Sequence, residues 1–161
     1  MTDSDTESYS TAQKVLHWSI VVLVFQQYFV FDVMAAPFRE TLDDGALVWT
    51  VTSVAHAAIG SVLSVLAVWR LALRLIEGAP LPVAREPHIA QKISKLAHGA
   101  FYILLLGLPV TGFGAWFLGN ETMARAHEYG TTALLVVLCL HVAAVLVHQF
   151  WWKTDLLRRM S

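Results

Sequence analysis

Apolar residues fall into four long blocks, and polar residues gather between the blocks. The blocks cover about residues 15–36, 47–75, 96–118 and 127–152. A helix that crosses a bilayer needs roughly 20 mostly apolar residues, and each block is long enough. Only helices and closed barrels satisfy their backbone in lipid, and these runs are too long and uniform for barrel strands. The pattern predicts an all-α integral membrane protein, a four-helix bundle.

Turn-forming residues separate the four blocks, at about 37–45, 78–82 and 119–121. Such short connections make neighbouring helices antiparallel. We expect residues 1–12 to be a polar tail and residues 13–161 to form one four-helix domain. The tail lacks the basic and apolar regions of a cleaved signal peptide, so the first block is expected to remain as an anchor. Pro109, Gly112 and Gly114 predict a bend or a looser outer half in the third helix.

Composition strengthens the membrane interpretation. The chain has 161 residues, of which 57% are hydrophobic and only 14% are charged, whereas a soluble domain carries about 25% charged residues. The single cysteine, Cys139, excludes a disulfide within the chain and a cysteine-based zinc site. Covalent attachment of a c-type haem is excluded too, because no Cys-x-x-Cys-His segment occurs. We expect lipid around the chain and no nucleic-acid partner.

Basic residues predict how the helices are oriented. Nine lysines and arginines fall on the side that holds both termini and the middle loop, and two fall on the other side. The nine are Lys14, Arg70, Arg74, Arg85, Lys92, Lys95, Lys153, Arg158 and Arg159, and the two are Arg39 and Arg125. Cytoplasmic loops are enriched in these residues, so both termini should be cytoplasmic. The six tryptophans mostly fall near predicted helix ends, as expected for an interfacial belt.

Histidines carry the candidate chemistry. All but one of the seven lie in or beside a predicted span; they are His17, His56, His98, His127, His141 and His148. Ionisable residues within spans are rare and usually functional. The fourteen residues between His127 and His141 return a helix to within about 40° of the same face and advance it by about 21 Å. One metal ion cannot use both histidines, but two stacked cofactors can.

Depth in the membrane suggests a partner for each of these two histidines. His56 lies in the outer half of the second span and matches His127, while His17 lies near the cytoplasmic side and matches His141. His98, on the third span, competes for the inner site in place of His17 or His141. Paired imidazoles are suited to occupy both axial positions of a haem iron. The pattern therefore predicts two haems b between helices.

Several segments resemble the prokaryotic cytochrome b561 family. They are Lys-Val-Leu-His-Trp at 14–18, His-Ala-Ala-Ile-Gly at 56–60, Leu-Ala-His-Gly at 96–99, His-Glu-Tyr-Gly at 127–130, and the end of the chain from Leu140 to Lys153. The resemblance covers about residues 9–160. It implies a dihaem protein of the bacterial inner membrane that exchanges electrons with quinone, either ubiquinone or menaquinone. The family's ligand positions match His17, His56, His127 and His141.

Two functions remain open from the sequence. Small free-standing proteins of this family resemble superoxide oxidases, which oxidise superoxide to O2 and reduce quinone; Arg39 and Arg125 would then guide the anion. The alternative is an electron relay for a periplasmic dehydrogenase or a soluble redox protein, docked at the acidic outer loops. His98 and His148 are candidates to bind quinone or a haem propionate. Arg70 and Arg74 are candidate propionate partners or simple positive-inside anchors.

Overall fold

Five α-helices make up most of the computed structural model, which describes residues 8–29, 34–80, 87–154 and 156–160. The helices are α1 (Thr11–Phe29), α2 (Ala35–Asp44), α3 (Val51–Ile76), α4 (His88–Leu118) and α5 (Glu121–Leu146). A π-helical turn, η2 (Val147–Trp151), extends α5, and a 3-10 turn, η3 (Leu156–Arg159), follows. No strand occurs in these ranges. The predicted all-α class is confirmed.

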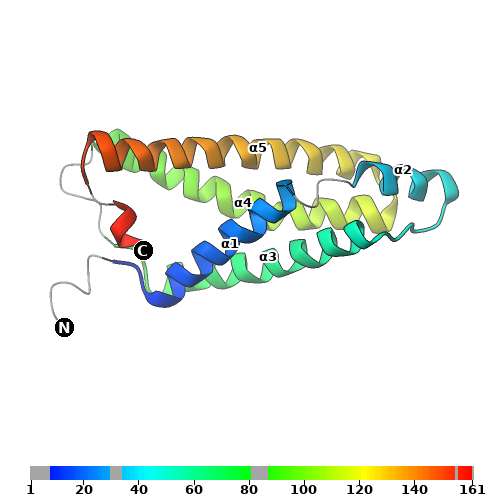
Figure 1. The fold of residues 1–161 in the computed structure, drawn as a ribbon, viewed down its shortest axis with the longest axis horizontal. Coiled ribbons are helices and arrows are strands. Elements are labelled where there is room, and N and C mark those ends of the chain that lie inside the picture. Colours follow the sequence, from blue (N-terminus) through cyan, green and yellow to red (C-terminus); the bar gives the residue numbers. More distant parts are fainter. Residues whose placement is uncertain (1–7, 30–33, 81–86, 155, 161) are drawn as a thin grey trace.

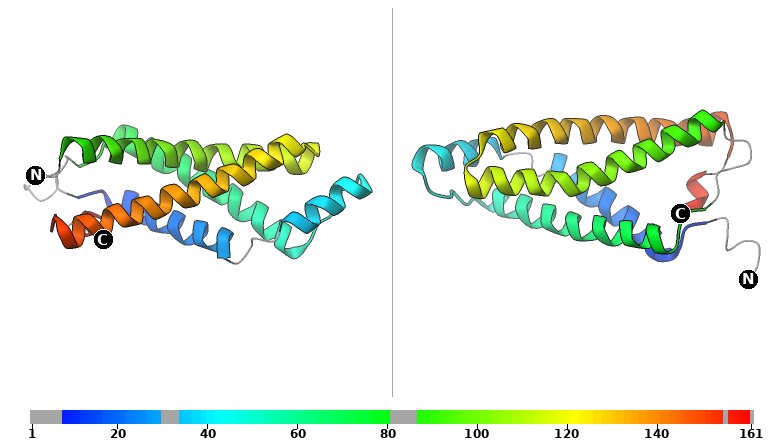
Figure 2. Two further views of the ribbon diagram at one scale, coloured as in Figure 1. Left: turned by 90° about the horizontal axis from the view of Figure 1, so that it is seen from above. Right: turned by 180° about the vertical axis from the view of Figure 1, so that it is seen from behind.

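The long helices form an elongated bundle with two distinct ends (Figure 1). The start of α1, the end of α3, the start of α4 and the end of α5 lie at one end, here called the terminal end. There the Tyr9 amide donates to the Arg159 carbonyl at 3.3 Å. At the other end, here called the α2 end, α2 lies beside the start of α3 and the turn between α4 and α5 (Figure 2).

Three helical segments are long and apolar enough to cross a membrane. They are Val51–Ile76, His88–Leu118 and Glu121–Trp151, with mean hydropathies of 1.9, 1.8 and 2.4. The fold is therefore an all-helical membrane bundle. The first predicted span, 15–36, corresponds in part to α1, which does not meet the same criteria. Residues 30–33 of that span lie outside the described ranges, as does Arg85.

Helix α2 occupies a segment that the sequence pattern assigned to a loop. Pro37 lies in its first turn, where a missing backbone N–H removes no hydrogen bond. Gly45 ends the helix with a φ of 65°, a left-handed conformation that glycine adopts at little cost. Turn-forming residues are equally suited to both helix ends, so they did not distinguish a loop from a short helix.

Little of the bundle is buried, as expected for helices that face lipid. Of the most apolar windows of the three spans, 17%, 17% and 6% of the residues are buried. The buried core lies between α1 and α3 and contains Ile20, Val24 and Leu63. Most other large apolar side chains point outward, where the hydrocarbon of a bilayer can solvate them.

Glycines allow α4 and α5 to pack closely toward the α2 end. A Cβ atom at Gly112 would lie 3.0 Å from the His127 ring, and one at Gly114 would overlap the sulfur of Met123. In the reverse direction, a Cβ at Gly130 of α5 would lie 2.8 Å from the Leu108 side chain. Small residues permit such approaches between membrane helices. Helix α4 continues unbroken through Pro109, and the expected looser half is instead packed against α5.

Candidate histidine sites

His56 of α3 and His127 of α5 face each other toward the α2 end; they are called the α2-end pair below. Their ring centroids are 6.2 Å apart, and the ring planes meet at 65°. An iron atom between two imidazole nitrogens, with metal–nitrogen bonds of about 2 Å, holds the centroids roughly 6 Å apart. His56 and His127, which the sequence predicts to match, thus form a spatial pair, and their separation would allow both to hold one iron.

The His127 ring contacts α4, and a side chain of α1 donates a hydrogen bond to the backbone of His56. The Nδ1 atom of His127 lies 2.8 Å from the Leu108 carbonyl oxygen and 3.4 Å from Thr111 Oγ1. Gln27 of α1 donates its side-chain N–H to the His56 carbonyl at 2.9 Å. The same amide would lie 3.4 Å from a Cβ at Gly60, so Gly60 is a place of close helix packing.

Three histidines lie nearer the terminal end: His17 of α1, His98 of α4 and His141 of α5, called the terminal cluster below. The rings of His98 and His141 lie 5.7 Å apart, with an interplanar angle of 85°. His17 lies within electrostatic range of both. Phe101 packs its ring edge-to-face with His141 at 5.4 Å. Of the two candidate partners, His98 is in ring contact with His141, and His17 lies within electrostatic range of it.

Arginines surround the terminal cluster. Arg70 is buried, donates to the Gln13 carbonyl and lies beside Tyr102. It lies within electrostatic range of His17, His98 and His141. Arg74, one turn further, donates to Tyr9 Oη at 3.4 Å. A buried cation is stable only with acceptors nearby, and these guanidinium groups make the cluster a favourable place for an anionic group.

The donor sets suit a haem better than a bare metal ion. Within the described residues, no group of three or more His, Cys, Asp or Glu side chains is arranged to hold an ion. A haem needs only axial ligands from the protein, so paired histidines suffice. Near the α2 end the buried indole N–H of Trp116 has no partner among the described residues. A haem carboxylate is an acceptor of suitable chemistry for this donor.

His148 lies beyond the end of α5, in the π-helical turn η2, away from both histidine groups. Its side chain is buried in η2, its Nδ1 lies 3.1 Å from Thr154 Oγ1, and its ring packs edge-to-face with Trp152 at 4.5 Å. A π-helical turn at the end of an α-helix often marks a functional place. These contacts fix the turn that joins α5 to the C-terminal segment.

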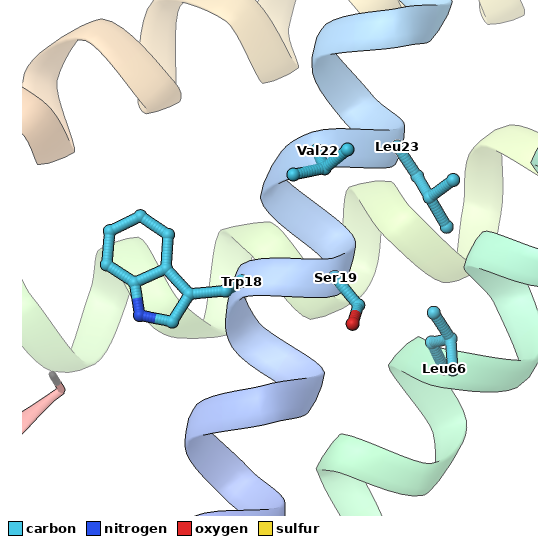
Figure 3. Close-up of a pocket in the computed structure, with 5 residues that line it drawn as sticks. All are labelled: Trp18, Ser19, Val22, Leu23 and Leu66. Carbon is cyan, nitrogen blue, oxygen red and sulfur yellow. The ribbon is translucent and has the colours of Figure 1, made fainter.

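An apolar groove of about 560 Å³ lies between α1 and α3 and contains no histidine. Its lining residues are Trp18, Ser19, Val22, Leu23 and Leu66. Figure 3 shows Trp18 extending from α1 away from the side that carries Leu23 and Leu66. Trp18 connects the groove with the terminal cluster, because its ring contacts His17 at 5.3 Å. The apolar lining of the groove is suited to lipid.

Basic residues at the α2 end are exposed and partly neutralised. Arg125 forms an ion pair with Glu121 at 3.6 Å, and both side chains are about two-thirds exposed. Arg39 is exposed on α2, beside exposed Glu40. The two arginines expected to guide an anion thus share their surface with carboxylates.

Sequence reasoning missed the residues that orient the histidines. The contacts of Leu108 use a backbone carbonyl, which leaves no signal in the sequence. The sequence predicts Gly112 only as a residue that loosens its helix. Trp116 was assigned to the interfacial belt, but its side chain is 6% exposed and packs against Trp49 at 5.4 Å.

Facing histidines between membrane helices are typical of membrane cytochromes that hold haem. The family model for prokaryotic cytochrome b561 matches residues 8–161, so the chain belongs to that family. The chain is also similar to cytochrome b562 of Cereibacter sphaeroides, with 27% identity over 155 residues that cover 94% of each chain. It is therefore a membrane b-type cytochrome of electron transport, and its family implies haem b.

Proposed function

We propose that the chain holds two haems b and carries electrons across the bacterial inner membrane. The observation that carries this proposal is the placement of His127 and His141 toward the two ends of α5, each beside a histidine of another helix. Their fourteen-residue separation corresponds to about 21 Å along the helix axis. Two haems at these depths would supply reversible one-electron oxidation and reduction of iron on either side of the membrane.

His56 with His127, and His17 with His141, are the proposed axial ligands. Extensive backbone packing joins α4 with α5, α1 with α3 and α3 with α4. Both proposed pairs instead join α5 to helices across the bundle, where a flat macrocycle can separate them. A haem between His98 and His141 would have to part α4 from α5, which pack closely. His98 also holds its Nδ1 2.7 Å from the Ser94 carbonyl in its own helix.

The distribution of basic residues supports cytoplasmic termini, with the α2 end in the periplasm. In this orientation the chain oxidises superoxide on the outer side and reduces quinone elsewhere. Each superoxide gives one electron and leaves as O2, and two electrons with two protons convert one quinone to quinol. His98 and His148 are proposed to bind quinone or a haem propionate, and Arg70 and Arg74 to bind propionates. Arg39 and Arg125 would guide the anion.

A relay function is the second candidate, and surface charge favours it. Exposed carboxylates of Glu40, Asp43, Asp44, Glu121 and Glu128 lie toward the α2 end. Such a surface repels superoxide but attracts a basic protein partner. In this case the electron donor is a periplasmic dehydrogenase or a soluble redox protein.

Purified oxidised protein tests both candidates. The reduced-minus-oxidised spectrum and a haem assay should give two haems b per chain, and a colourless protein made with ample haem would overturn the proposal. Superoxide is then added with a quinone analogue, with and without superoxide dismutase. Catalytic quinol formation that dismutase abolishes supports the oxidase. Haem reduction only by a partner protein supports the relay.

A further inference from the structure

The His127 ring rests on one side of α4, toward the α2 end. Its Nδ1 approaches the Leu108 carbonyl at 2.8 Å, and Thr111 Oγ1 donates to the same carbonyl at 2.9 Å. The Leu108 carbonyl therefore lies within hydrogen-bond distance of two side chains, one on its own helix and one on α5.

The contact with Leu108 determines which ring nitrogen carries the proton. A carbonyl oxygen only accepts hydrogen bonds, so His127 Nδ1 must be the donor. In a neutral imidazole the other nitrogen, Nε2, then has a free lone pair. Metal-binding histidines commonly donate their second N–H to such an acceptor, which fixes the orientation of the ring. His127 is thus prepared to ligate through Nε2.

Gly112 provides the space for this arrangement. A Cβ at position 112 would lie 3.0 Å from Cε1 and 3.1 Å from Nδ1 of His127. These separations are tighter than ordinary carbon contacts of about 3.5–4.0 Å. A side chain at 112 would therefore displace the ring that bonds Leu108.

We propose that Gly112 and the Leu108 carbonyl form a seat on α4 that positions the His127 imidazole with Nε2 directed to the haem iron. The inference rests on the proposed role of His127 as an axial ligand. Gly112 is a positioning residue, because it acts only through the ring. The seat belongs to the α2-end pair, whereas His141 makes ring contacts with His98 and Phe101.

The test compares Gly112→Ala with Gly107→Ala. Both changes remove a glycine from the interior of α4, but a Cβ at Gly107 meets nothing within 4 Å. Gly112→Ala should shift the low-spin ferric electron paramagnetic resonance signal of one haem and weaken its retention roughly tenfold. Gly107→Ala should change neither quantity. If the two variants behave alike, the seat is wrong.

A second measurement removes the His127 ring and keeps the site. His127→Gly should lose one haem, and added imidazole, which needs no seat, should restore it. In this background Gly112→Ala should have no further effect on haem retention or on the spectrum. An effect that persists in the double variant would show that position 112 acts through helix packing, which overturns the seat.

If Gly112→Ala alone fails to fold, the double variant with His127→Gly still tests the inference. Removal of the ring removes the clash, so this double variant should fold with imidazole. If it also fails to fold, the inference is overturned. The proposed function fails by a different result. If His127→Gly retains both haems without imidazole, His127 is not an axial ligand, whatever the behaviour of position 112.

Discussion

The two histidine groups of the bundle differ in what holds their rings. At the α2-end pair, a backbone carbonyl and a glycine of α4 fix His127, and the two rings stand 6.2 Å apart. In the terminal cluster, three histidines and a buried arginine share one region, and ring contacts orient His141. The α2-end pair is thus distinguished by a hydrogen bond and close packing at one ring, and the terminal cluster by a buried cation nearby. We expect changes at the α2-end pair to affect haem retention most, and changes of charge in the terminal cluster to affect the redox potential of its haem.

The largest expected effect is the loss of one haem at the α2-end pair. His56→Ala and His127→Ala should each reduce the haem-to-protein ratio from about two to about one, because an iron that loses one axial imidazole is held weakly. The pyridine haemochrome assay measures this ratio. His88→Ala, at the exposed start of α4, is the matched control and should keep both haems. A normal ratio in His127→Ala would contradict the assignment.

The next prediction concerns the choice within the terminal cluster. His17→Ala should lose the inner haem, and His98→Ala should keep both, because a haem between α4 and α5 would force apart helices that pack closely. The same haem assay decides between them. The reverse result would assign His98 as the ligand of the cluster and leave the α2-end pair unaffected.

Charge in the terminal cluster should appear in the redox potential. Arg70→Gln should lower the midpoint potential of the inner haem, because a nearby cation disfavours the more positive ferric state. We expect a shift of tens of millivolts, where about 59 mV is a tenfold change for one electron. Spectroelectrochemical titration measures both haems at once. The potential of the outer haem is the internal control, and an equal shift of both would contradict a local effect.

Helix packing beside the α2-end pair should be sensitive to added volume. Gly130→Ala places a Cβ 2.8 Å from the Leu108 side chain and should destabilise the protein by about 1–3 kcal/mol. Gly107→Ala has open space and should stabilise it by about 0.5–1 kcal/mol, because alanine favours helix. Thermal unfolding in detergent, followed by circular dichroism, compares the two. Equal melting temperatures would show that α4 and α5 are not tightly packed here.

The smallest predicted effect is the loss of one hydrogen bond between helices. Tyr28 of α1 donates its hydroxyl to the Thr131 carbonyl of α5. Tyr28→Phe should lower the free energy of unfolding by about 1 kcal/mol. It should leave the spectrum of the terminal cluster unchanged. A changed inner-haem spectrum would mean that α1 transmits the effect toward His17, and the two sites would not be independent.

The sequence by itself determined the helical class, three of the membrane-spanning segments and the family, because long apolar runs and the spacing of histidines are local properties of the chain. Spacing along one helix also predicted that His127 and His141 lie at two depths, since helical rise and rotation are fixed.

Only the tertiary structure decided how the rings are held. The contact of Leu108 with His127 involves a backbone atom nineteen residues away, and the role of Gly112 depends on which side chain approaches it. Likewise, α2 formed where turn residues predicted a loop, and Trp116 became buried in place of facing lipid. These features depend on which helices come into contact and how close they lie, and both are set by packing between segments that are distant in the sequence.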